Sequence, residues 1–149
     1  MAEPARPNAV AQENAQPGSR DWLLARPRID ATTRFRCPWI EGYGSATSVA
    51  AGERLQLFVS TNPASDLTID VYRTGYYGGL GARHVAHLGV LSGRPQPDPP
   101  VGPRRLRACA WEVTAELDIP RGWLSGVYLA KLTALRDGTQ AGAAVLSMT

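Results

Sequence analysis

A strict alternation of apolar and polar residues over WEVTAELDI, residues 111–119, constrains the fold more than any other feature of the chain. The acids Glu112, Glu116 and Asp118 fall at alternate positions. In a strand these acids share one face, whereas a helix would scatter them around its whole circumference. The segment is therefore predicted to be a half-buried strand that begins at Trp111 and turns its acids to solvent.

The same period of two recurs along the chain and predicts an all-β fold. Further strands are expected at residues 54–61, 67–73, 127–135 and 143–148, separated by turns rich in Gly, Pro, Asn and Asp. No segment has a credible helical period. The sequence predicts an immunoglobulin-like antiparallel β-sandwich of about seven strands over residues 46–149, preceded by an irregular, partly disordered arm over residues 1–45.

A structural corner is expected where the strand after residue 127 begins. In immunoglobulin-like folds, a tyrosine at the start of a late strand bonds its hydroxyl to the backbone a few residues upstream. The step Gly126-Val127-Tyr128 fits this pattern, and Trp123 is expected to cover the same corner. We therefore assign structural roles to Trp123, Gly126 and Tyr128, and also to Trp111.

The arm is rich in Pro, Ala, Asn, Gln and Arg, and its first dozen residues are expected to be mobile. Trp22, Leu23, Leu24, Trp39 and Ile40 supply enough apolar bulk for the later part to wrap around the domain, with one short strand near Trp22.

The stretch YRTGYYGGLGAR, residues 72–83, raises the question of a binding loop because it holds four glycines, three tyrosines and two arginines. A phosphate-binding loop needs its lysine or a following helix, and this stretch has neither. Gly78 and Gly79 are instead expected to build a tight turn between two strands. The candidates for an interface or a ligand site are Tyr72, Arg73, Tyr76, Tyr77 and Arg83.

No catalytic, cofactor or metal residues are predicted. His84 and His87, three positions apart, are expected on opposite faces of a strand, which argues against a shared metal ion. Ser125 lies outside a nucleophile elbow. Cys37 and Cys109 could form one disulfide or remain two free thiols.

Charge and composition exclude other classes of function. The net charge is +3, the basic residues are scattered apart from Arg104, Arg105 and Arg107, and no nucleic-acid partner is expected. No signal peptide or membrane span is visible, so the chain is predicted to be soluble and cytoplasmic. The five prolines of residues 93–103 predict a stiff connector, with docking to an aromatic groove as the alternative.

Four blocks of the chain resemble the N-terminal region of the N,N-dimethylformamidase large (beta) subunit family. They are ENAQPGSRDW (13–22), IEGYGSATSVAAGE (40–53), IDVYRTGYYGGLGAR (69–83) and CAWEVTAELDIPRGWLSGVYLAKLT (109–133). The resemblance implies an accessory β-sandwich that precedes a larger amide-hydrolysing domain, and that larger domain is expected to carry iron held by tyrosine and glutamate.

Under this resemblance the partner is the catalytic domain or subunit of the same enzyme, self-association is possible, and the tyrosine turn serves as an interface. The sequence ends at Thr149, so the chain is expected to be either a fragment or a stand-alone module. The alternative function is a carbohydrate- or polymer-binding module that uses the tyrosines of the turn.

Overall fold

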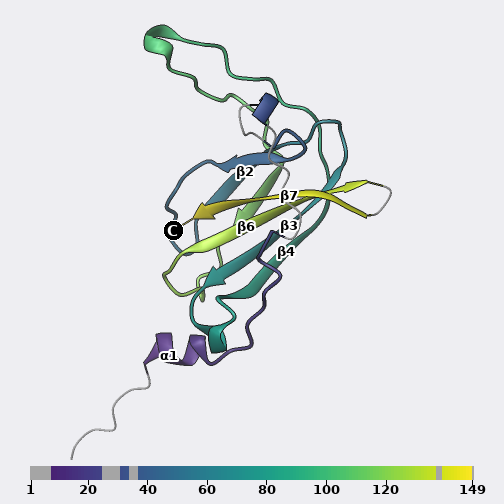
Figure 1. The fold of residues 1–149 in the computed structure, drawn as a ribbon. Coiled ribbons are helices and arrows are strands. Elements are labelled where there is room, and N and C mark those ends of the chain that lie inside the picture. The colour runs from purple at the N-terminus through teal and green to yellow at the C-terminus, as the bar shows by residue number, and fades with distance from the viewer. Residues whose placement is uncertain (1–7, 25–30, 34–36, 137–138, 149) are drawn as a thin grey trace, which may run out of the picture.

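The computed structural model describes residues 8–24, 31–33, 37–136 and 139–148, with backbone only for the last of these ranges. Two antiparallel sheets face each other across one core, which confirms the predicted β-sandwich (Figure 1). The three-stranded sheet has the order β1-β2-β5 and the four-stranded sheet the order β4-β3-β6-β7. The strands are β1 (Glu41–Gly44), β2 (Arg54–Ser60), β3 (Asp66–Thr74), β4 (Ala82–Ser92), β5 (Ala115–Asp118), β6 (Tyr128–Arg136) and β7 (Thr139–Met148).

The core lies between the sheets and is built by the predicted alternation. On β2, Leu55 and Leu57 are fully buried, and on β3 every second residue from Leu67 to Val71 is buried. Strand β6 contributes a matching row of small and large apolar residues. Such period-two burial on both inner faces is what closes a sandwich.

Strand order and one corner give the sandwich its immunoglobulin-like character. The Tyr128 hydroxyl donates to the Leu124 carbonyl at 2.5 Å, which is the hydrogen bond expected at this corner. The Trp123 ring stacks on the Tyr128 ring at 5.0 Å between centroids and 7° between planes, so it covers the corner as predicted.

Strand β5 is shorter than the nine residues expected. The Thr114 hydroxyl, rather than a backbone carbonyl, accepts from the Val59 amide, so regular pairing starts only at Ala115. Trp111 turns away, donates its indole N–H to the Pro97 carbonyl and contacts the Tyr43 ring. The acids of β5 do face solvent, where Arg54 binds both Glu116 and Asp118.

The N-terminal segment departs from the expected irregular arm. A six-residue helix, α1 (Ala9–Asn14), begins at the cap Asn8, whose side chain accepts from the Val10 amide, and Pro17 prevents its continuation. In place of a strand near Trp22 there is an isolated bridge between Ser19 and Ala82. Strand β1 belongs to the sandwich although it lies ahead of the boundary predicted at residue 46.

The two ends of the sandwich differ. Helix α1 lies beside the β3–β4 turn at one end, and the long proline-rich connection between β4 and β5 extends from the other (Figure 1). That connection contains a short 3₁₀ turn, η3 (Pro103–Arg105). Among the described residues, no helix has the length and apolar character needed to cross a membrane.

Candidate functional site

The turn between β3 and β4 is built by glycines, as the sequence predicted. It contains the 3₁₀ turn η2 (Tyr77–Gly79), in which Gly78 and Gly79 adopt positive φ angles of 65° and 88°. A β-carbon would strain this left-handed backbone even though nothing lies within 4 Å of either position. Tyr77 itself has a φ of 41°, a left-handed backbone conformation that tyrosine rarely adopts.

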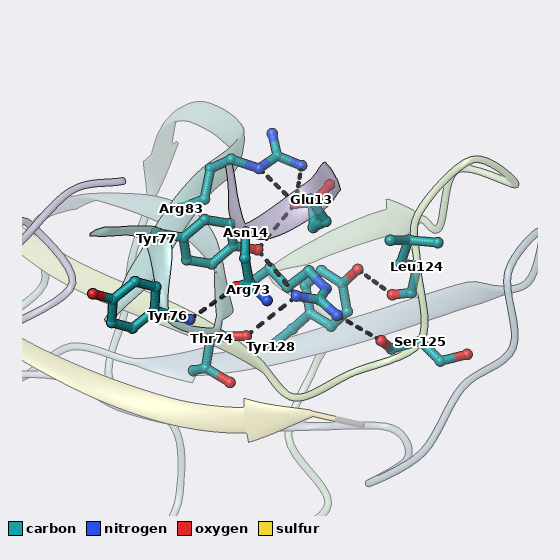
Figure 2. A network of polar contacts seen from close by, with 10 residues as sticks. All are labelled: Glu13, Asn14, Arg73, Thr74, Tyr76, Tyr77, Arg83, Leu124, Ser125 and Tyr128. Atoms are coloured by element: carbon teal, nitrogen blue, oxygen red, sulfur yellow. Dashed lines mark hydrogen bonds and ion pairs between the residues drawn. The ribbon is translucent and has the colours of Figure 1, made fainter. Parts of the chain in front are cut away.

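Arg73 anchors the turn from below, because its side chain is directed into the protein and the residue is only 6% exposed (Figure 2). One terminal nitrogen donates to the Tyr77 hydroxyl at 3.1 Å, and the other donates to the Ser125 carbonyl at 2.9 Å. A β-carbon on Gly126 would lie 3.0 Å from this second nitrogen, so the absence of a side chain there makes room for the guanidinium. Arg73 therefore joins the turn to the β5–β6 connection.

Glu13 supplies the negative charge that Arg73 and Arg83 need. Its carboxylate, 13% exposed, accepts from the Tyr77 hydroxyl at 3.0 Å and from the Arg83 Nε at 2.7 Å. The Arg83 Nη2 lies 2.6 Å from the same oxygen. A carboxylate from α1 thus closes a chain of polar contacts that runs from Ser125 through Arg73 and Tyr77 to Arg83 (Figure 2). We call Glu13, Arg73, Tyr77 and Arg83 the tip network.

The tip network keeps Glu13 ionised. Burial alone would raise the pKa of Glu13, but hydrogen bonds from Arg83 and Tyr77 and the charges of Arg83 and Arg73 outweigh it. The pKa of Glu13 therefore lies below its ordinary value of 4.5. Charge-assisted hydrogen bonds of this kind are stronger than neutral ones.

The adjacent tyrosines of the turn have opposite environments. Tyr77 is 1% exposed, whereas Tyr76 is 71% exposed and its ring points away from the tip network (Figure 2). The Tyr76 amide donates to the Asn14 side chain at 2.9 Å, so α1 also holds the backbone that carries the exposed ring. At least one exposed ring was expected from this pair, and Tyr76 is that ring.

The remaining candidates are partly or wholly enclosed. Tyr72 is 4% exposed, and burial together with the charges of Asp70 and Asp21 raises its pKa to about 12. Arg83 is partly exposed but its guanidinium is bound to Glu13. Of the five candidate residues for an interface or a ligand, Tyr76 is the one whose side chain is largely exposed to solvent.

The prediction that His84 and His87 lie on opposite faces of a strand is wrong. The His84 Nε2 and the His87 Nδ1 lie 2.8 and 2.7 Å from the same Asp70 oxygen. The β3–β4 register shifts between Val71 and Tyr72, and the extra residue on β4 brings both imidazoles to one face. Both histidines are hydrogen-bonded to Asp70, and the described residues contain no group of three or more His, Cys, Asp or Glu side chains suited to a metal ion.

Cys37 and Cys109 are free thiols in this structure, Cys37 partly buried and Cys109 exposed. Sequence reasoning missed Glu13 and Asn14 as partners of the turn. The signal available was the run NAVAQEN, residues 8–14, which begins with a capping asparagine, is followed by Pro17 and so predicts a short helix with Glu13 and Asn14 at its end.

Chemically, the Arg83 guanidinium and the Tyr77 hydroxyl bind one carboxylate, that of the chain's own Glu13. Arg73 supports this arrangement through its hydrogen bond to the Tyr77 hydroxyl and through its charge. The fold and this internal network define an immunoglobulin-like β-sandwich domain with an aromatic-tipped turn that is held by side-chain contacts.

Comparison with models of known protein families identifies the family of this domain. A family model described as N,N-dimethylformamidase beta subunit-like, C-terminal, matches residues 68–147, which is more than half of the chain. The chain belongs to the N,N-dimethylformamidase beta subunit-like family. Neither the curated proteins nor the solved structures contain a match.

The match also corrects the sequence-based expectation in one respect. The resemblance implied the N-terminal region of the large subunit, whereas the matching model describes the C-terminal region. The matched residues cover nearly all of β3 and β7 and the strands between them, so they include the turn with Tyr76 and the corner at Tyr128.

Replacing Tyr77 by Phe tests the tip network. The change removes the hydroxyl that links Arg73 to Glu13, and we expect it to lower the free energy of unfolding by about 1–3 kcal/mol. Tyr76→Phe is the matched control, because the exposed neighbour should change stability by less than about 0.5 kcal/mol. Urea denaturation measures both. If the two changes lowered the free energy of unfolding equally, the buried Tyr77 hydroxyl would stabilise the fold no more than the exposed Tyr76 hydroxyl does.

The lowered pKa of Glu13 predicts a pH dependence of stability. The stabilisation from its carboxylate is fully present above 4.5, the ordinary value, and is lost as the pH falls through the lower folded-state value. Glu13→Gln should therefore be less stable than the native chain by about 1–3 kcal/mol at pH 7. This gap should shrink as the pH falls below about 4. The exposed Glu112→Gln serves as control, and a gap that stays constant with pH would contradict the assignment.

Proposed function

We propose that this chain is a non-catalytic accessory β-sandwich unit of an N,N-dimethylformamidase-like amide hydrolase. It packs against the catalytic domain or subunit of the same enzyme through the turn that carries Tyr76. The observation that carries the proposal is the 71% exposure of Tyr76 on a turn whose neighbouring side chains, Arg73 and Tyr77, are buried. Family membership supports the amide-hydrolase setting.

The turn is organised before any partner binds. Its backbone is held by the Asn14 side chain on one side and by the tip network on the other. Binding by a pre-ordered aromatic residue costs little conformational entropy, and exposed tyrosines are enriched among the residues that dominate binding energy at protein interfaces. Tyr76 therefore has the exposure and rigidity of an interface anchor.

The chemistry of the polar groups supports an accessory role. The carboxylate of Glu13 is engaged by Arg83 and Tyr77, and the acids of β5 are engaged by Arg54. The two histidines both bond to Asp70 on the outer face of the four-stranded sheet. Groups held in such pairs support the structure of the domain, and we assign the iron and the hydrolytic step to the catalytic part of the enzyme.

The alternative, a polymer-binding module built on the tyrosines of the turn, has less support. Sugar binding by stacking needs exposed aromatic faces, and both Tyr72 and Tyr77 are buried within the chain itself. Tyr76 alone presents its ring. A single exposed ring fits a protein interface better than a row of sugar-binding subsites.

The test uses the assembled enzyme, in which this chain is expressed together with the catalytic domain or subunit and loaded with iron. We expect Tyr76→Ala to weaken docking of the sandwich on the catalytic part at least about tenfold, as loss of an interface anchor does. The isolated domain should keep its stability. Val90→Ala is the control, because Val90 is 65% exposed but lies on β4 away from the turn.

Two results would contradict the proposal. In one, the purified chain alone, supplied with iron, releases dimethylamine from N,N-dimethylformamide above the rate of a heat-denatured sample. In the other, Tyr76→Ala and Val90→Ala have the same effect on docking.

A further inference from the structure

A cleft lies next to the tip network, at the end of the sandwich where the β1–β2 connection faces the β5–β6 connection. There the protein encloses a half-open cleft of about 420 Å³. Its walls include Val49, Ile119, Trp123 and Leu124, with Ser48 and Ser125 as polar members. None of the residues that line this cleft carries a formal charge at neutral pH.

One wall of the cleft is fixed by interactions already described. The Leu124 carbonyl accepts from the Tyr128 hydroxyl, and the Ser125 carbonyl accepts from Arg73 at 2.9 Å. The Trp123 ring is held flat against the Tyr128 ring, with 7° between their planes. The wall therefore depends on the same buried arginine that holds the turn.

The opposite wall is held by one backbone hydrogen bond to Ile119 and by two contacts within the β1–β2 connection. The Gly52 amide donates to the Ile119 carbonyl at 2.8 Å, and the Glu53 amide donates to the Ala50 carbonyl at 3.1 Å. The Ala50 amide in turn donates to the Glu53 carboxylate at 2.8 Å. Both walls are thus held by contacts within the chain itself, which is the arrangement expected of a largely preformed ligand pocket.

The lining defines the chemistry of the occupant. A charged ligand would lose its hydration without gaining a counter-ion, which is costly in an apolar site. The paired rings of Trp123 and Tyr128 favour a flat aromatic partner, and two serines can supply one or two orienting hydrogen bonds.

The volume defines the size of the occupant. A cavity of roughly 150 Å³ accommodates benzene, and drug-like pockets span about 300–1,000 Å³. The cleft of about 420 Å³ is therefore large enough for a compound of two fused rings. We propose that it is a binding site for an uncharged, planar small molecule about as large as such a two-ring compound.

The test uses 2-naphthol as the neutral planar probe and 2-naphthoate as its charged counterpart. Both are titrated into the whole ¹⁵N-labelled chain and followed by amide and indole chemical shifts. We expect 2-naphthol to bind with a dissociation constant of about 0.1–1 mM, which is ordinary for a ligand of this size. Shifts should be confined to residues 48–51 and 119–128. Binding of 2-naphthoate should be at least about tenfold weaker, because its charge has no partner in the cleft.

Variants locate the site. Ala51→Phe is expected to fill the cleft and weaken 2-naphthol binding at least about tenfold, since Ala51 lines it and is itself exposed. Ser48→Phe provides a second filling change should the first reduce folding. Ala110→Phe places the same ring on an exposed residue that does not line the cleft and should leave binding unchanged.

Three outcomes would overturn the proposal. They are no shift of the cleft residues at 5 mM 2-naphthol, equal binding of the naphthoate, and binding unaffected by the filling variants. Occupancy of the cleft only by an aromatic side chain of a protein partner, with free 2-naphthol excluded, would overturn it as well.

Discussion

The end of the sandwich that carries the β3–β4 turn depends on the hydrogen bonds of one buried group, the guanidinium of Arg73. It ties three segments that are distant in sequence: helix α1 through Tyr77 and Glu13, the β3–β4 turn, and the β5–β6 connection through Ser125. A buried cation is stable only when its hydrogen bonds and its charge are matched. One nitrogen of this guanidinium, the buried Arg73 Nε, has no hydrogen-bond partner among the described residues. The two terminal nitrogens therefore carry its stabilising hydrogen bonds, to the Tyr77 hydroxyl and the Ser125 carbonyl.

Arg73 supports both candidate surfaces, the turn that carries Tyr76 and the cleft beside Ser125. On one side the tip network buries Tyr77 and leaves Tyr76 exposed on a fixed backbone. On the other side the same guanidinium holds the Ser125 carbonyl, which sets the wall of the neutral cleft. The proposed interface and the proposed ligand site are thus supported by one residue, although each is tested separately. Gly126 belongs to this arrangement because a side chain there would press on the guanidinium.

The sequence predicted the sandwich because alternation of apolar and polar residues is a local property. Leu55, Leu57 and the row from Leu67 to Val71 are buried as their spacing indicates. The corner at Tyr128 and the glycine turn were also predictable, since both depend on short motifs.

What could not be predicted depends on contacts between distant residues or on irregular pairing. Glu13 meets Arg83 and Tyr77 across more than sixty positions, and no local pattern encodes that meeting. The shared bond of His84 and His87 to Asp70 follows from a register shift, which reverses the face that simple alternation assigns. The cleft requires the β1–β2 and β5–β6 connections to be placed side by side, and only the closed sandwich does this.

A double-mutant cycle between Glu13→Gln and Tyr77→Phe tests most directly whether the tip network acts as one unit. The free energies of unfolding of the native chain, both single variants and the double variant are measured by urea denaturation at pH 7. If the network is cooperative, the double variant should be more stable than the sum of the single effects implies, by about 0.5–3 kcal/mol. Effects that add to within about 0.3 kcal/mol would contradict the central role given to the network.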